Sequence, residues 1–143
     1  MTQSMIMDKT NKQNITFGLT GKGILDNNNK FRNMCSQTVI IITDEFEDEG
    51  IIRDLADTIL TRGCKNVAFC GTASDEWQRI FCEEDREING FCDAGNYDDF
   101  AIMWRFEDLE SLSDVVGRCW NEVLILCSNL TLIRECRTIL TES

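Results

Sequence analysis

The sequence contains no histidine and no proline among its 143 residues. Without histidine, a Ser-His-Asp or Cys-His catalytic arrangement, histidine phosphotransfer and the common catalytic zinc sites are excluded. None of the eight cysteines forms a Cys-x-x-Cys pair, so the usual signature of a structural zinc site is missing as well. The chemistry that stays open is carboxylate-and-metal chemistry, a thiolate activated at a helix terminus, or no catalysis.

Long apolar segments are also absent. No run approaches the roughly 18 apolar residues that span a bilayer, and the N-terminal residues lack the apolar segment of a secretory signal. We therefore expect a cytoplasmic protein that does not enter the membrane. Most cysteines occupy apolar positions of predicted strands and helices, so we expect them to be reduced and to pack as small hydrophobic residues.

Positive charge is scarce, with 14 Lys and Arg against 25 Asp and Glu and a net charge of −11. Residues 1–36 carry five basic and two acidic side chains, whereas residues 37–143 carry nine basic and twenty-three acidic ones. Such a field repels nucleic acid and anionic membranes and attracts cations or basic proteins. We expect a basic protein partner and no nucleic acid.

Strand and helix patterns alternate regularly after residue 37. Apolar runs rich in β-branched residues predict strands at 38–43, 66–70, 100–106 and 122–127. Helical spacing of apolar residues predicts helices over 48–62, from Thr72 or Ser74 onward, over 109–120 and over 131–140. Such repeats build a parallel sheet with helices on both faces. The prediction is a single three-layer α/β domain, Rossmann-like or flavodoxin-like, with about four parallel strands.

This α/β domain is predicted to span residues 37–143, after a polar N-terminal arm at residues 1–36. The arm is expected to be partly disordered or to add one strand at 15–19. Its GLTGKG stretch does not fit a phosphate-binding loop, because only two residues separate Gly18 from Gly21-Lys22. A flexible turn is the preferred interpretation.

Acidic residues follow the first and third strands of the predicted domain. If the strand order is 2-1-3-4, these two strands flank the crevice in which open parallel sheets bind ligands. Both acidic groups are then expected at one edge, with Arg105 paired to a carboxylate there or to an anionic ligand group. The residues concerned are Asp44, Glu45, Glu47, Asp48 and Glu49 after the first strand, and Glu107, Asp108 and Glu110 after the third.

Three interpretations of these eight carboxylates stay open. They can form a surface that binds a basic protein, or those at 47–49 and 107–110 can favour the N-termini of helices through the helix macrodipole. Alternatively, Asp44, Glu45, Glu107 and Asp108 can hold a Mg²⁺ ion that clamps a phosphate. The motifs of response-regulator receivers and haloacid-dehalogenase-type phosphatases are both incomplete, since Phe106 and Ser128 replace residues that the receivers need.

We therefore predict a non-catalytic protein without a cofactor that recognises a basic protein partner, as an immunity protein or a subunit of a defence or regulatory complex would. The alternative is a Mg²⁺-dependent phosphoryl-transfer or nucleotide-binding enzyme with its site at the strand ends. Cys70 precedes a helix, a position that can activate a thiol, but Asp75 and Glu76 oppose this, so a buried cysteine is preferred. Core packing is likewise preferred for Trp77, Trp104 and Trp120.

The layout of residues 38–127 has further recognisable parts. The first strand leads into acidic residues, and Gly63-Cys64 precedes the second strand. Ser74 and Trp77 begin a helix, Asp98-Asp99 precede the strand with Trp104, and Glu107-Asp108 follow it. This layout resembles a family of small bacterial proteins known only as a domain of unknown function. Residues 1–36 and the absence of histidine depart from it. The resemblance implies an α/β fold and a bacterial origin, and no activity.

Overall fold

The computed structural model describes residues 15–21, 23, 25–26, 29–45, 47–89, 101–119 and 122–142. Expectations for residues 1–14, Cys92, Asp98-Asp99 and Trp120 lie outside these residues. Within the described chain, no helix is long and apolar enough to cross a membrane.

Five strands form one sheet, and every pairing between neighbouring strands is parallel. The parallel α/β fold predicted from the sequence is confirmed, and two of the predicted strands have the predicted bounds. Residues 15–19 add a fifth strand at one side of the sheet. In sheet order, the strands are β2 (Ile15–Leu19), β6 (Glu122–Cys127), β3 (Gln37–Ile42), β4 (Asn66–Cys70) and β5 (Ile102–Arg105).

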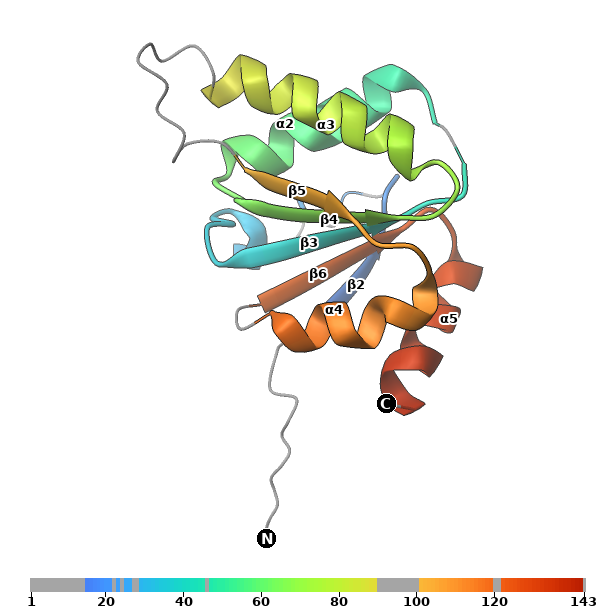
Figure 1. The fold of residues 1–143 in the computed structure, drawn as a ribbon. Helices are drawn as coiled ribbons and strands as arrows, with labels where there is room; N and C mark the ends of the chain where they lie inside the picture. Colours follow the sequence, from blue (N-terminus) through green and yellow to red (C-terminus); the bar gives the residue numbers. More distant parts are fainter. Residues whose placement is uncertain are drawn as a thin grey trace, which may run out of the picture.

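Helices cover both faces of this sheet. Figure 1 shows α2 (Glu49–Thr61) and α3 (Ser74–Asn89) over one face, and α4 (Leu112–Arg118) and α5 (Leu130–Glu142) over the other. The predicted helix over 109–120 begins instead as a 3₁₀ turn, η4 (Leu109–Ser111), in which the backbone N–H of Leu112 donates to the Leu109 carbonyl. The Asp108 carboxylate caps this turn by accepting a hydrogen bond from the backbone N–H of Ser111.

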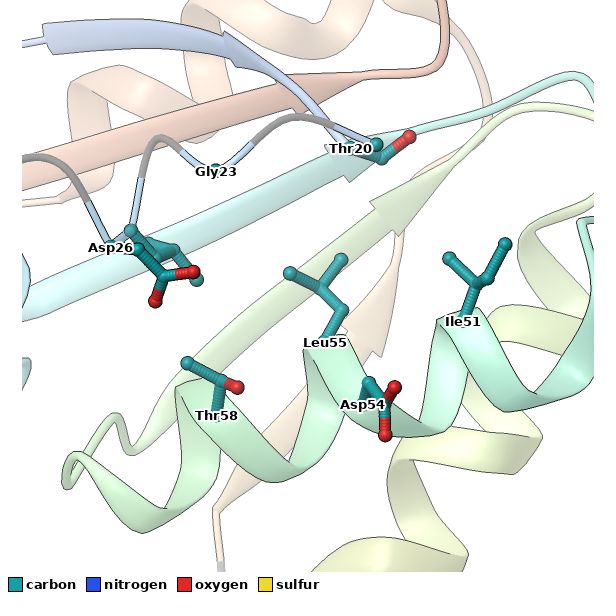
Figure 2. A pocket seen from close by; sticks show the side chains of 9 residues that line it. Thr20, Gly23, Asp26, Ile51, Asp54, Leu55 and Thr58 are labelled. Carbon is teal, nitrogen blue, oxygen red and sulfur yellow. The ribbon is translucent and has the colours of Figure 1, made fainter.

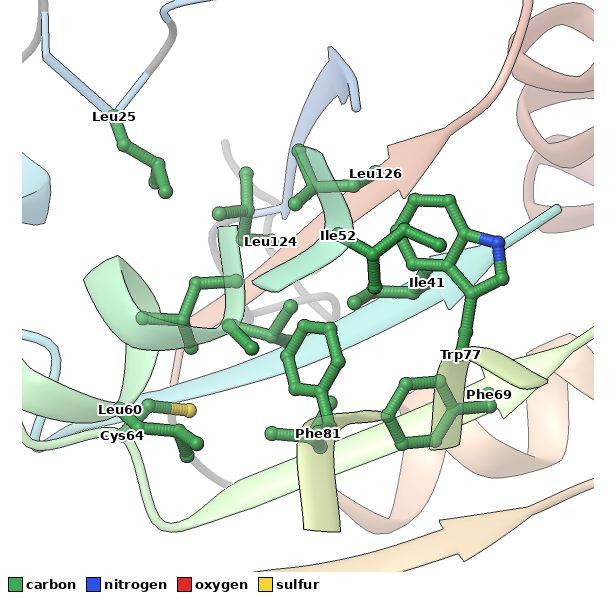
Figure 3. Packing of buried hydrophobic residues seen from close by; sticks show 14 of the residues in the cluster. Leu25, Ile41, Ile52, Leu60, Cys64, Phe69, Trp77, Phe81, Leu124 and Leu126 are labelled. Carbon is green, nitrogen blue, oxygen red and sulfur yellow. The ribbon is translucent and has the colours of Figure 1, made fainter. Parts of the chain in front are cut away.

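The hydrophobic core consists of two layers, one on each face of the sheet. All six residues of β3 are buried, as its β-branched run predicts for a strand covered on both faces. Its Ile41 side chain packs in the α2/α3 layer with Trp77 and Phe69, which Figure 3 shows, whereas Ile40 and Ile42 pack in the α4/α5 layer. Trp77 is fully buried, as predicted. Trp104 is half-buried and lies against Phe106, with ring centroids 6.2 Å apart.

The segment between β2 and β3 belongs to the same core. Leu25, Phe31 and Met34 are buried in the α2/α3 layer, where they cover the part of the sheet beyond α2. Arg62, which follows α2, donates hydrogen bonds to the carbonyl oxygens of Leu25 at 2.8 Å and Phe31 at 3.2 Å. These bonds tie the segment to the end of α2.

The conditional strand order 2-1-3-4 is wrong. With β3 numbered as the first strand, the order is 3-2-1-4, and β2 lies beyond the fourth strand. Since α2 and α3 lie on the same face, the chain moves in one direction from β3 through β4 to β5 (Figure 1). The connection through α4 then crosses the opposite face and places β6 on the other side of β3. The strand order therefore reverses between β3 and β6.

Candidate functional site

The eight predicted acidic residues, which we call the acidic rim, lie at the end of the sheet where the parallel strands have their carboxyl termini. We call this end the strand-end edge. They do not converge as expected, because β4 lies between β3 and β5. Asp44 and Glu45 follow β3, while Glu107 and Asp108 follow β5, on the two sides of Cys70 at the end of β4. The expected crevice between the first and third strands is therefore not formed.

The thiol of Cys70 lies at this edge and is affected by its burial and by the nearby carboxylates. The residue is 2% exposed, and burial raises the pKa of its thiol to about 11, with the negative charges of Asp108 and Asp44 adding to the rise. A nucleophilic cysteine needs the opposite shift, because the thiolate is the reactive form. The preference for Cys70 as a buried packing residue is confirmed.

The loop after β3 is folded over the end of β4. The Asp44 carboxylate accepts a hydrogen bond from the backbone N–H of Thr72 at 3.2 Å, and the Thr72 hydroxyl donates to the Asp44 carbonyl at 2.9 Å. The Trp77 indole N–H donates to the Glu45 carbonyl at 3.2 Å. Asp44 is thus a structural residue that joins two loops of the strand-end edge.

Three further rim carboxylates have roles around the start of α2. Asp48 caps the helix by accepting a hydrogen bond from the backbone N–H of Gly50 at 2.8 Å. Glu47 accepts a hydrogen bond from the Thr20 hydroxyl at 3.3 Å. Glu49 forms an ion pair with Arg53 at 2.7 Å. Asp48 and Glu49 at α2 and Asp108 at η4 support the helix-start interpretation, whereas Asp44 and Glu47 bond to neighbouring loops.

The other three rim residues are Glu45, Glu107 and Glu110. All three are exposed, and their carboxylates bond no other side chain or backbone group of the described chain. They are the rim residues whose carboxylates make no hydrogen bond or ion pair with another described residue. This division within the rim is not readable from the sequence, where all eight residues look alike.

The four carboxylates of the Mg²⁺ alternative are not brought together. In the described part of the chain, no three Asp, Glu or Cys side chains form a group that could hold a metal ion. The physical reason is that β4 separates Asp44 and Glu45 from Glu107 and Asp108. In addition, Asp44 and Asp108 already accept hydrogen bonds from backbone N–H groups.

Two further carboxylates, Asp75 and Glu76, lie next to the rim at the start of α3. Asp75 forms an ion pair with Arg105, which is the carboxylate partnership that the sequence suggested for this arginine. Glu76 pairs with Arg79 at 3.4 Å. Their position in the first turn of α3 is the signal that could have added them, because every helix that follows a parallel strand begins at this edge.

The negative charge at this edge exceeds what the fold compensates. Among the described residues, ten carboxylates, the rim with Asp75 and Glu76, lie near three guanidinium groups, those of Arg53, Arg79 and Arg105. Arg53 and Arg79 also pair with Glu83 of α3. The four helices that begin here each contribute about +0.5 charge from the macrodipole, roughly +2 in all. About five of these ten negative charges are therefore not balanced by the described cations and helix macrodipoles.

The carboxylates of Glu83, Glu49 and Glu84 hold the pKa of Arg53 above its ordinary value. Arg53 contacts Glu83 at 2.6 Å and Glu84 at 3.0 Å, and so links α2 to α3. Its guanidinium is therefore turned toward α3 and away from the opposite side of α2.

The point where the strand order reverses carries hydroxyl groups. Thr43 and Ser128 directly follow the paired residues Ile42 of β3 and Cys127 of β6. Their buried hydroxyl oxygens have no hydrogen-bond partner among the described protein atoms. Thr20 occupies the equivalent position after β2, and its backbone N–H donates to the Cys127 carbonyl.

A groove of about 340 Å³ opens between the loop after β2 and helix α2. Figure 2 shows Leu55 and Thr58 pointing from α2 toward this loop, with Asp26 across from them. The groove is not predictable from the sequence, because its two walls are about thirty residues apart in the chain and meet only when it is folded. We call it the α2 groove; it is lined by Thr20, Gly21, Gly23, Leu25 and Asp26 on one side and by Ile51, Asp54, Leu55 and Thr58 on the other.

No protein-family model, curated protein or solved structure matches the chain. The layout resemblance of residues 38–127 therefore gains no further support. Any function has to be argued from the site itself.

Proposed function

We propose that this protein is a non-catalytic binding protein that recognises a basic protein partner through the acidic rim. The observation that carries the proposal is the surplus of about five negative charges that remains at the strand-end edge after the nearby arginines and the helix macrodipoles are counted. The carboxylates of Glu45, Glu107 and Glu110 belong to this surplus, and they bond to no other described residue. A field of one sign on one end of a molecule steers an oppositely charged partner.

The kind of partner follows from the sign and the breadth of the field. The uncompensated carboxylates are spread across the ends of β3, β4 and β5, which suits a protein surface better than a single small ligand. Nucleic acid and anionic lipid would be repelled. An immunity protein that neutralises a basic toxin, or an accessory subunit of a defence or regulatory complex, meets these requirements. We place this role in the cytoplasm, where free thiols stay reduced.

The test is association kinetics across ionic strength. The partner is first captured from the source cell at low salt, and the rate of association with the purified partner is then measured by stopped flow. Because steering accelerates encounter about 10- to 1,000-fold and is screened by salt, the rate is expected to fall steeply as salt is added.

Two variants with equal changes in net charge make this test specific. The double variant Glu45→Gln/Glu107→Gln removes two rim charges that pair with no other described residue, and it should lower the association rate and flatten its salt dependence. Asp57→Asn/Glu87→Gln removes two exposed charges outside the rim and should change the rate less. Identical salt slopes for both variants and the wild type, or a captured partner that is itself acidic, would overturn the proposal.

A further inference from the structure

The α2 groove combines a wall held by hydrogen bonds, two aliphatic side chains of α2 and a carboxylate that pairs with no cation of the described chain. The wall formed by the loop after β2 is held at one end by the Thr20 hydroxyl, which donates to Glu47, and by the Thr20 N–H, which donates to Cys127. It is held at the other end by Arg62, which bonds the Leu25 carbonyl. These bonds fix Thr20 and Leu25 before any ligand arrives, which lowers the cost of binding.

The opposite wall is one face of α2. Leu55 is half-buried there, and Ile51, at the end nearest the rim, keeps 47% of its surface exposed. A large exposed aliphatic residue among carboxylates offers a surface to the alkyl stem of a long basic side chain, which buries its stem and keeps its charge at a polar site.

Asp54 supplies the charge in the α2 groove. It is exposed, and its carboxylate pairs with no cation of the described chain. Its neighbour Arg53 is engaged with Glu49, Glu83 and Glu84, and Asp26 across the groove is paired with Arg62 at 3.3 Å. The described residues that line the groove carry two carboxylates and no cation, and Asp54 is the one left without a partner.

Thr58 lies one turn after Asp54 on α2, and both residues line the groove, so it holds a carboxylate and a hydroxyl. This pair of acceptors suits a planar guanidinium, which presents several N–H donors in a fixed fork, better than an ammonium group. A volume of about 340 Å³ is at the lower end of the range for ligand pockets and suits one long side chain.

We propose that the α2 groove receives an arginine side chain of the basic partner, with its guanidinium at Asp54 and Thr58 and its alkyl stem against Leu55 and Ile51. This inference rests on the proposed function and names a specific contact within it. The rim attracts the partner over a distance, and the groove, which begins next to the rim at Ile51, supplies a contact that slows dissociation.

The first experiment uses N-acetyl-argininamide as the probe and records amide chemical shifts of the ¹⁵N-labelled protein at millimolar probe concentrations. Shifts are expected at Gly21, Gly23, Asp54 and Thr58, and Asp54→Asn should weaken the apparent affinity at least fivefold. Asp57→Asn removes the same charge from the same helix outside the groove and should change the affinity less than twofold. N-acetyl-citrullinamide, which is neutral but of similar shape, should produce no shifts in the groove.

Each other outcome overturns the inference in a distinct way. Shifts confined to residues 44–49 would place arginine on the rim and leave the groove without a role. Equal binding of the citrulline compound would show that charge is not recognised. Tighter binding of putrescine than of the arginine compound would identify a small amine as the occupant instead of a protein side chain.

The same two variants then separate this inference from the proposed function. In complex with the captured partner, Asp54→Asn should raise the Kd at least tenfold, mainly through faster dissociation, while Asp57→Asn leaves it within about twofold. If Asp54→Asn binds the partner as tightly as the wild type, the groove inference fails and the proposed function stands. If no basic partner is captured at all, the proposed function itself fails.

Discussion

At the scale of single residues, Gly71 packs tightly against the backbone of the loop after β3 at the strand-end edge. Gly71 has φ +112°, and a Cβ atom there would lie 1.8 Å from the carbonyl oxygen of Thr43. This contact positions the loop that carries Asp44 and Glu45 against the end of β4. Glycine is required here for both its backbone conformation and its lack of a side chain.

We predict that Gly71→Ala destabilises the protein by about 3 kcal/mol or more. The alanine would be strained at this φ, and its Cβ atom would overlap the Thr43 carbonyl, so the loop after β3 would have to move. The matched control is Gly117→Ala in α4, where no atom lies within 4 Å of the added Cβ. That substitution should stabilise the protein by up to about 1 kcal/mol. Urea unfolding of both variants measures the difference, and equal stabilities would show that the loop is not held as described.

The buried thiols give the protein a second residue-scale property, a sensitivity to alkaline pH. Burial raises the pKa of Cys64 and of Cys70 to about 11, above the value of about 8.5 for a thiol in an unfolded chain. The folded state therefore holds these protons more tightly than the unfolded state. The resulting stability is fully present below pH of about 8.5 and is lost as the pH rises toward about 11.

We predict a loss of about 1 to 2 kcal/mol per buried thiol across this pH window. Urea unfolding at pH 8 and at pH 10.5 should show a smaller loss in Cys64→Ala/Cys70→Ala than in the wild type, because other groups titrate equally in both. Cys35→Ala, which removes an exposed thiol, is the control and should keep the wild-type pH dependence. Parallel behaviour of all three proteins would contradict the assignment.

At the scale of elements, the start of α2 distinguishes carboxylates that the fold uses from those that it does not. Asp48 caps this helix through the N–H of Gly50, so Asp48→Ala should lower the free energy of unfolding by about 1 kcal/mol. Asp48→Asn keeps a capping oxygen and should retain most of the stability. Glu45→Ala, a few residues away, should stay within about 0.5 kcal/mol of the wild type. Thermal and urea unfolding measure all three, and a cost for Glu45→Ala as large as that for Asp48→Ala would remove the distinction.

The elements also show how far the sequence could predict this fold. The bounds of β4 and β6 were predictable because apolar runs of strand length end abruptly in polar residues at both sides. The strand order was not predictable, because no residue pattern indicates which face of the sheet α3 or α4 covers. The rim carboxylates were predictable as a group, but their division into capping and uncommitted residues depends on contacts such as those from Thr72 to Asp44. The α2 groove depends on the packing of the N-terminal segment against α2, which leaves no local signal.

At the scale of the whole molecule, the uncompensated rim should cost stability. With a net charge of −11, the carboxylates that make no contacts repel their neighbours across the strand-end edge. Natural proteins commonly give up some stability at a functional surface. The helix-start interpretation makes the opposite claim for the same residues, because a carboxylate near a helix N-terminus stabilises the fold. Stability measurements can therefore decide between the two without knowledge of the partner.

We predict that Glu45→Gln/Glu107→Gln raises the melting temperature by about 1 to 3 °C at low ionic strength, since two repelling charges are removed. The gain should shrink as salt is added, because the screening length falls from about 30 Å at 0.01 M to about 8 Å at 0.15 M. Asp57→Asn/Glu87→Gln, which changes the net charge equally at exposed positions outside the rim, should raise the melting temperature less. A lower melting temperature for the rim variant at low salt would mean that Glu45 and Glu107 stabilise the helix starts. The negative charges on which the proposed function rests would then stabilise the fold, and they would no longer support a recognition surface at the rim.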